Sequence, residues 1–353
     1  MYKNESKITE DGFGVHTFEL TIPSITKDEF ERIVNCADKS FSCNDGNSIF
    51  IYPERHGIRF FLNHTENNFY NIKVIVSPRR LIDENSQPLD ILRASDDFDR
   101  LEFLINQSII ECLGNEYSIE SFKLSRFDFC VNIMLSESFS AERYVKLLKR
   151  SMKYNSCAEI IEFPDEVTNS AEKNKHSFRI RTGDMTFTAY DKYFQLENIG
   201  ELFDKISEAF LRLEIAINRD FIRSIEQTYL EKPDNIEIVS TLTSCSERFF
   251  KEFVKNNFFE GDYYDITAMK FLIASSGLKQ KAKATMLDYA DVQCRKQSHL
   301  SAKKHMSKNL GSKSKLKKMY SNFDMLKVYP ISVSYRDKHG CKPVSGLYRI
   351  MDI

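Results

Sequence analysis

The first candidates for covalent chemistry in this 353-residue chain lie between Phe187 and Glu197, in the segment FTAYDKYFQLE. Side chains of a strand alternate between two faces, so Tyr190 and Lys192 should share one face of a strand here. A phenol becomes a nucleophile as it loses its proton, and a nearby ammonium group lowers the pKa of that phenol. The residue types at this spacing raise the question of whether the tyrosine and the lysine form a reactive site.

Two further segments predict strands that carry acids opposite an apolar face. Residues 124–135 read LSRFDFCVNIML, and residues 210–219 read FLRLEIAINR. If these strands pair with the tyrosine strand in one antiparallel sheet, Asp128, Tyr190 and Glu214 converge on one surface.

Two interpretations of this polar face are open from pattern alone. A sheet with one wet face displays polar residues in any case, and an Arg opposite an acid can be an ordinary cross-strand ion pair. Alternatively, a carboxylate between apolar neighbours on a central strand needs a cation. Arg126, Arg212 or a divalent metal ion could supply that positive charge.

Three motifs in this order and spacing resemble the replication initiation factor family, which comprises rolling-circle plasmid replication initiators of the staphylococcal type and related conjugative-element relaxases. The motifs are SRFDFCVN, RTGDMTFTAYDK and LRLEIAINRD, all within residues 119–225. They match an Arg-x-Asp strand, a turn leading into a Tyr-x-Lys strand, and an Arg-x-Glu strand. The remainder of the chain matches the family only in general character.

The resemblance implies an enzyme, a metal-dependent DNA strand transferase that nicks and rejoins DNA at an origin. The family's nucleophile falls by position on Tyr190, and its reaction gives a 5′-phosphotyrosyl intermediate and a free 3′-OH. Tyr193 is an alternative nucleophile, although as the neighbour of Lys192 it should point to the opposite face. The family's metal-binding acids fall on Asp128 and Glu214, with Mg²⁺ or Mn²⁺ as the cofactor. Many members carry a second acid four residues beyond the first, where this chain has Asn132, an uncharged oxygen ligand.

Two cations complete the predicted catalytic set. Lys192 and Arg181 would lower the pKa of the tyrosine and stabilise charge on the scissile phosphate. The seven histidines are isolated, and no His-x-His pair is present in the sequence. A site based on carboxylates therefore has to replace the familiar histidine nicking site.

The net charge of −1 hides a strong asymmetry along the chain. Residues 279–318 hold 12 Lys or Arg against two acids, a balance of +10, so the other residues sum to −11. This pattern favours a polyanionic partner, although a solvated Lys-rich helix is the plainer alternative. Two helices around the sequence SSGL are compatible with a helix-turn-helix. The candidate DNA-binding residues are Lys279, Lys281, Lys283, Arg295, Lys296, Lys303, Lys304, Lys313, Lys315, Lys317 and Lys318.

The periodicity predicts an α+β fold in which helices cover one face of antiparallel sheets, with a mainly helical, basic C-terminal region. We expect an N-terminal half (1–115) and a catalytic half (116–232), which are candidate pseudo-repeats, and a DNA-recognition region (233–353). Helical spacing predicts further helices over 88–113, 140–152 and 199–211.

Composition narrows the remaining questions. No segment reaches the roughly 18–20 apolar residues of a membrane span, and the eight cysteines contain no CxxC pair, so we expect a cytoplasmic protein with reduced thiols. Expected partners are origin DNA, both as duplex and as a single-stranded nick site, a host helicase and polymerase, and a second copy in a homodimer. One alternative is a non-catalytic DNA-binding protein of the same fold. An RNA-binding sheet is disfavoured because no aromatic RNP signature is present.

Overall fold

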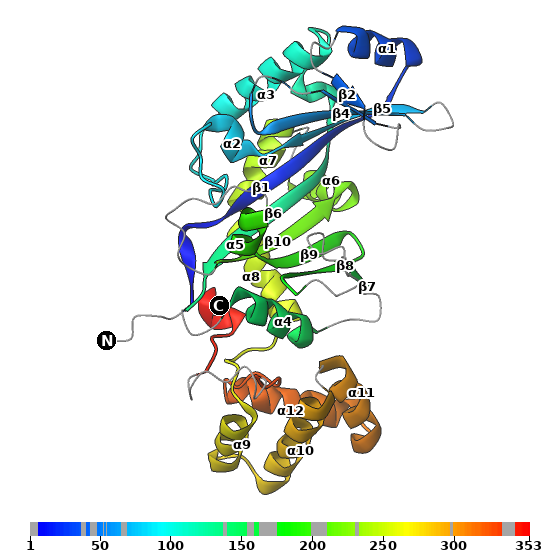
Figure 1. Ribbon diagram of the computed structural model, residues 1–353. Coiled ribbons are helices and arrows are strands. Elements are labelled where there is room, and N and C mark those ends of the chain that lie inside the picture. Colours follow the sequence, from blue (N-terminus) through cyan, green and yellow to red (C-terminus); the bar gives the residue numbers. More distant parts are fainter. Residues whose placement is uncertain are drawn as a thin grey trace.

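One ten-stranded antiparallel sheet forms the body of the protein in this computed structural model, with strand order β2-β3-β4-β5-β1-β6-β10-β9-β8-β7 (Figure 1). The strands are β1 (Lys7–Ile25), β2 (Ser40–Ser42), β3 (Ser48–Ile51), β4 (Ile58–His64), β5 (Tyr70–Val76), β6 (Lys123–Met134), β7 (Glu159–Ile161), β8 (Ser177–Thr182), β9 (Met185–Asp191) and β10 (Phe210–Asn218). The structure describes all residues except 1–5, 37–39, 43–47, 52, 54, 65–68, 137–139, 154–158, 162–174, 199–209, 230–232, 297–298 and 334–342.

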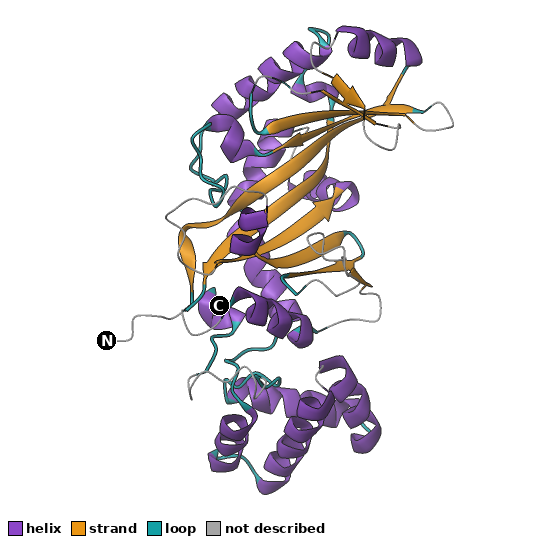
Figure 2. Ribbon diagram, in the orientation of Figure 1, coloured by secondary structure: helices purple, strands orange, loops and turns teal. Residues whose placement is uncertain are grey.

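Helices flank the sheet and form a separate layer at the C-terminal end (Figure 2). They are α1 (Lys27–Cys36), α2 (Pro78–Ile82), α3 (Phe98–Leu113), α4 (Ala141–Ser151), α5 (Lys192–Asn198), α6 (Arg219–Tyr229), α7 (Asn235–Ser244), α8 (Ser246–Asn257), α9 (Ile266–Ser275), α10 (Gln280–Lys296), α11 (His299–Leu310), α12 (Lys313–Met325) and α13 (Leu347–Ile350). The predicted α+β class with a helical C-terminal region is confirmed.

The sheet consists of two halves with the same topology. In the first half, β1 is followed by α1 and then β2 to β5, and in the second half β6 is followed by α4 and then β7 to β10. From the centre outward the strand order is β1-β5-β4-β3-β2 on one side and β6-β10-β9-β8-β7 on the other. The antiparallel β1–β6 ladder joins the halves into one sheet, while the division of the chain at residues 115 and 232 stays a prediction.

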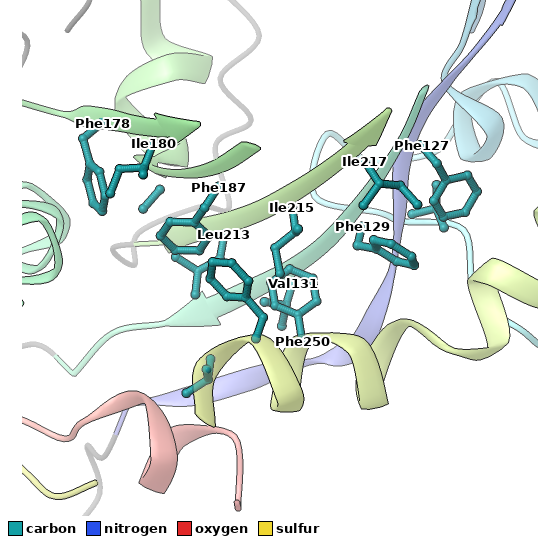
Figure 3. Packing of buried hydrophobic residues seen from close by; sticks show 14 of the residues in the cluster. Phe127, Phe129, Val131, Phe178, Ile180, Phe187, Leu213, Ile215, Ile217 and Phe250 are labelled. Carbon is teal, nitrogen blue, oxygen red and sulfur yellow. The ribbon is translucent and has the colours of Figure 1, made fainter. Parts of the chain in front are cut away.

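The apolar face of the sheet is covered by helices and forms the main core (Figure 3). Phe129 of β6 stacks on Phe249 of α8 with ring centroids 4.5 Å apart, and Phe187 of β9 stacks on Phe253 at 5.0 Å. Both sheet phenylalanines are buried, and each such side chain contributes roughly 1.5–3 kcal/mol on leaving water. This packing fixes which face of each strand is left for polar residues.

Two of the predicted helices differ from the structure. The helix expected over 88–113 begins only at Phe98, because the Asp97 side chain caps it by accepting a hydrogen bond from the Arg100 backbone N–H. Most of the helix expected over 199–211 lies outside the described residues, but Phe210 and Leu211 belong to β10. The helix expected over 140–152 is α4, with Ser140 as its N-cap.

Helices α9 to α12 form the layer that lies beyond α4 in Figure 1. The chain enters and leaves this layer side by side, because Asp262 pairs with Val328 and Asp265 pairs with Val333. Tyr263 and Tyr329 stack between these segments with ring centroids 4.2 Å apart. Among the described residues, the helices are all too short or too polar to cross a membrane.

Candidate active site

The strand registers bring the predicted tyrosine and acids to the polar face of the sheet. In the β6–β10 ladder Asp128 lies opposite Ala216, and Glu214 lies opposite Cys130. In the β9–β10 ladder Tyr190 lies opposite Arg212. Directly opposed residues share a face, so all of these side chains are on the side of the sheet away from the apolar core.

A tyrosine–carboxylate–histidine cluster is the centre of this face. The Tyr190 hydroxyl donates to Oε1 of Glu214 at 2.7 Å, and Nδ1 of His16 is 3.0 Å from the same oxygen. The Glu214 side chain is 16% exposed and that of His16 is 32% exposed, so the cluster is reached by solvent. It has the parts of an activated nucleophile, a hydroxyl bonded to a proton acceptor that a third group orients.

His16 was not predicted as a site residue, and its place in β1 explains why. The β1–β6 register pairs Val15 with Phe129 and Thr17 with Asp128, so one extra residue, His16, lies in a β-bulge. A bulge breaks the alternation on which sequence reasoning depends. The only available sequence signal was an isolated histidine, which has no motif spacing.

The charges around Tyr190 keep its phenol protonated in the free protein. Burial and the Glu214 carboxylate raise the pKa of Tyr190 well above its usual value, and Arg212 opposes this shift. Burial on its own would raise the pKa of Glu214, but the hydrogen bonds from His16 and Tyr190 and the charge of Arg212 lower that pKa to about 2. Burial lowers the pKa of His16, so at neutral pH a neutral imidazole contacts an ionised carboxylate.

Asp128 is held in a second, adjacent network. Its Oδ1 accepts from Nε of Arg126 at 2.7 Å, and its Oδ2 accepts from the Thr17 hydroxyl at 2.6 Å. The carboxyl group is 5% exposed, and burial raises its pKa although Arg126 opposes the shift. Both carboxylate oxygens therefore already have protein partners.

Arg212 is a fully buried cation that sequence reasoning treated only as a partner for acids. Its Nε donates to Oδ1 of Asn132 at 2.7 Å, and its Nη2 donates to the carbonyls of Leu89 and Pro88 at 3.1 and 3.3 Å. Its Nη1 has no hydrogen-bond partner among the described residues. This arrangement holds a permanent positive charge next to Tyr190.

The donor set does not fit a divalent metal ion as it is arranged. The Asn132 oxygen accepts from Arg212 while its amide nitrogen donates to Leu89, and the Asp128 oxygens are bonded as described above. Across the described ranges of the chain, three acids, histidines or cysteines do not gather in a metal-binding group. A metal at Asp128, Glu214 and Asn132 would have to displace these contacts, so the metal roles stay predictions.

Lys192 and Arg181 are placed differently from the prediction. Lys192 is the first residue of helix α5 and not part of the strand, which ends at Asp191, yet its ammonium nitrogen is 5.9 Å from the centre of the Tyr190 ring. It is 5% exposed and donates to Gln195 at 2.8 Å. Burial and the charge of Arg212 lower the pKa of Lys192 to about 7.

Arg181 is exposed and lies opposite Thr186, two positions toward the end of β8 from Arg179. Arg179 was not predicted, but it shares the polar face and donates to the Thr188 hydroxyl at 3.3 Å. It is therefore nearer to Tyr190 along the sheet than Arg181 is. The alternative nucleophile Tyr193 lies in α5.

The basic segment 279–318 is mainly helical, as predicted for the C-terminal region, and forms helices α10, α11 and α12. Helices α9 and α10 are joined at the SSGL turn, residues 275–278, whose first serine is the last residue of α9. Lys283 donates to the carbonyl of Ala274 at 2.7 Å and so helps to close this turn. The other candidate DNA-binding cations lie between Lys279, which directly precedes α10, and Lys318 on α12. All of them are exposed except Lys303, which is partly buried. Their role toward DNA stays a prediction.

No family model matches the chain, and no curated protein matches it. Among solved structures, a rolling circle replication initiator protein from Geobacillus stearothermophilus is similar over 72% of this chain and 86% of that chain, with a TM-score of 0.34 and 14% sequence identity. This is a distant similarity at the level of the fold.

Proposed function

We propose that this protein nicks and rejoins DNA at an origin, with Tyr190 as the nucleophile. The observation that carries the proposal is the 2.7 Å hydrogen bond from the Tyr190 hydroxyl to Glu214, on a polar sheet face that solvent reaches. Arg212 lies directly opposite Tyr190 in the ladder, so a cation is in place for the negative charge that a reacting phenol develops.

These contacts indicate how protons move in the proposed cleavage step. Tyr190 attacks a backbone phosphorus, its proton passes to Glu214, and a phosphotyrosyl bond forms as the bond to the 3′-oxygen breaks. The leaving 3′-oxygen takes up this proton from Glu214 and becomes a 3′-OH. Rejoining reverses these steps, because the 3′-OH then attacks the phosphotyrosyl bond and Tyr190 leaves with its proton restored.

Four cations surround the reacting groups in this proposal. Lys192 and Arg212 act on the phenol, and Arg179 on the neighbouring strand is positioned for the phosphate, with Arg181 further out. A pKa near 7 gives Lys192 a mixed population of amine and ammonium at neutral pH, so it can also exchange protons with the site.

A divalent cation remains part of the proposal only as a requirement to be tested. When bound, Mg²⁺ or Mn²⁺ would polarise a phosphate oxygen. Glu214 and Asp128 are the residues that could approach it after exchanging their present partners. Activity measured in EDTA and then in Mg²⁺ or Mn²⁺ tests this requirement directly.

Duplex recognition is assigned in this proposal to the C-terminal helices, in a cytoplasmic protein whose further partners would be a helicase and a polymerase. The helix pair α9–α10 has the lengths and the short turn of a helix-turn-helix. Lysines on α12 would contact backbone phosphates and make binding depend steeply on salt.

The test uses supercoiled plasmid that carries the cognate origin. The unmodified protein should relax the plasmid and form a covalent protein–DNA adduct, and Tyr190→Phe should abolish both because it removes only the hydroxyl. Tyr193→Phe is the matched control and should keep full activity. Adduct formation by Tyr190→Phe, or its loss in Tyr193→Phe alone, would overturn the assignment of the nucleophile.

A second candidate function is a DNA-binding protein of this fold that does not cleave. It is favoured by one observation, the engagement of Asp128 and Asn132 with protein cations where a metal would otherwise bind. Tight origin binding by the unmodified protein, with supercoils left intact in every metal tested, would support it.

A further inference from the structure

The two halves of the sheet correspond strand by strand, so each residue of the candidate active site has a counterpart in the first half. Strands β4 and β9 both have seven residues and occupy equivalent positions in the sheet. When they are matched end to end, Tyr190 corresponds to Asn63. The ladders agree, because Tyr190 lies opposite Arg212 and Asn63 lies opposite Asn71.

The counterpart face in the first half carries a positive charge where the candidate active site carries a negative one. Glu214 lies two residues after Arg212, and Lys73 lies two residues after Asn71, so an ammonium group replaces the carboxylate. The nucleophilic tyrosine is replaced by Asn63, whose amide donates to Asn71 at 2.9 Å. The first half therefore has no hydroxyl at the nucleophile's position, and its charge suits a phosphate.

Aromatic rings accompany this cation on the same face. Phe61 of β4 lies opposite Phe50 of β3, with ring centroids 4.3 Å apart and planes at 60°. The Lys73 ammonium nitrogen is 5.1 Å from the centre of the Phe61 ring. All three side chains are half-buried, and Arg59, two residues before Phe61 on β4, is exposed. We call Phe50, Phe61, Lys73 and Arg59 the aromatic-basic surface.

We propose that the aromatic-basic surface binds single-stranded DNA beside the nick site. Rings of this kind stack on bases regardless of sequence, and neighbouring cations hold the backbone phosphates. From β4 to β9 there are five strand spacings, or about 24 Å across one continuous face. This separation is within the reach of a strand that occupies about 4–16 nucleotides, the range of single-stranded binding folds.

An aromatic pair across two strands also stabilises a sheet without any ligand. The experiment must therefore separate stacking on DNA from packing within the protein. The inference rests on the proposed function only for the kind of strand that occupies the surface, because binding in EDTA requires no cleavage.

The chain has no tryptophan, so Phe61→Trp places a single indole within the surface. Titration with oligothymidylate in EDTA should quench its emission as bases stack on the indole. The matched control is Phe103→Trp on α3, where Phe103 is 64% exposed, and its emission should not change. Equal responses of the two tryptophans, or none from Phe61→Trp while the labelled oligonucleotide reports binding, would overturn the proposal.

Affinity gives a second readout. Phe61→Leu and Lys73→Gln should each weaken oligothymidylate binding, measured by fluorescence anisotropy, by about fivefold or more. Lys27→Gln on α1 is the charge control and should bind as the unmodified protein does. Thermal unfolding of each variant shows whether a loss of binding comes from misfolding. If Phe61→Leu does not fold, the fluorescence response of Phe61→Trp tests the same position.

The outcomes for this proposal and for the proposed function are distinct. If Phe61→Leu loses binding and the unmodified protein does not nick DNA, the proposed binding surface is supported and the proposed nicking function is rejected. If folded Phe61→Leu and Lys73→Gln bind as the unmodified protein does, and nicking is intact, the proposed binding surface is rejected and the nicking function is supported.

Discussion

At the scale of single residues, Lys192 carries a conflict between burial and charge. Its folded-state pKa of about 7 lies below the ordinary lysine value of 10.5, so at pH below 7 the folded protein must hold a buried ammonium group. Between these two values the unfolded chain binds more protons than the folded chain. Stability should therefore rise with pH in this window, as the cost of burying the charge disappears.

The corresponding prediction concerns Lys192→Met. This variant should be more stable than the unmodified protein at pH 6.5, and its advantage should shrink by up to about 1.4 kcal/mol per pH unit between pH 7 and pH 10. Denaturant unfolding at several pH values measures the difference. Lys27→Met, at a side chain 65% exposed, should show no such trend, and a pH-independent advantage for Lys192→Met would contradict the prediction.

The residues that sequence reasoning found are those that obey alternation. Asp128, Tyr190 and Glu214 were placed on one face correctly because β6, β9 and β10 have no bulge between them. His16 was missed because it is the bulged residue of a distant strand. The contacts of Arg212 with the carbonyls of residues 88–89 were missed because no local pattern specifies the path of that segment over the sheet.

At the scale of secondary structure, α12 is the element whose charge is easiest to test. Lys315, Lys317 and Lys318 are exposed on it. If all three bind phosphates, replacing them with Gln should reduce the slope of log affinity against log salt by about 0.9 for each phosphate that is no longer neutralised. Filter binding of origin duplex over a range of salt concentrations measures this slope, with Lys27→Gln as control. An unchanged slope would place the DNA elsewhere.

Elements with strong periodicity were predicted well, and their ends were not. Strands β6 and β10 and helix α4 match the expected segments, whereas α3 starts ten residues later than expected and Lys192 begins a helix where a strand was expected to continue. Both errors are at element ends. There a cap such as Asp97 decides the outcome more than the apolar pattern does.

At the scale of the whole molecule, β1 determines whether the two halves can exist apart. It pairs with β5 on one side and with β6 on the other, so the first half supplies the strand that covers the edge of β6. Equivalent topology indicates two similar units, but one shared ladder couples their folding. A chain without residues 1–115 would leave the inner edge of β6 with unpaired backbone groups, and such edges promote aggregation.

Residues 116–353 expressed alone should therefore aggregate or lack a cooperative thermal transition, as followed by size-exclusion chromatography and circular dichroism. Co-expression with residues 1–115 should restore a soluble complex, because the β1–β6 ladder then forms between two chains, and should also return His16 to Glu214. The restored complex should regain any nicking activity that the intact chain has. A monodisperse, cooperatively melting 116–353 fragment would instead show that the second half is an independent domain, and the ladder would then be only a contact between domains.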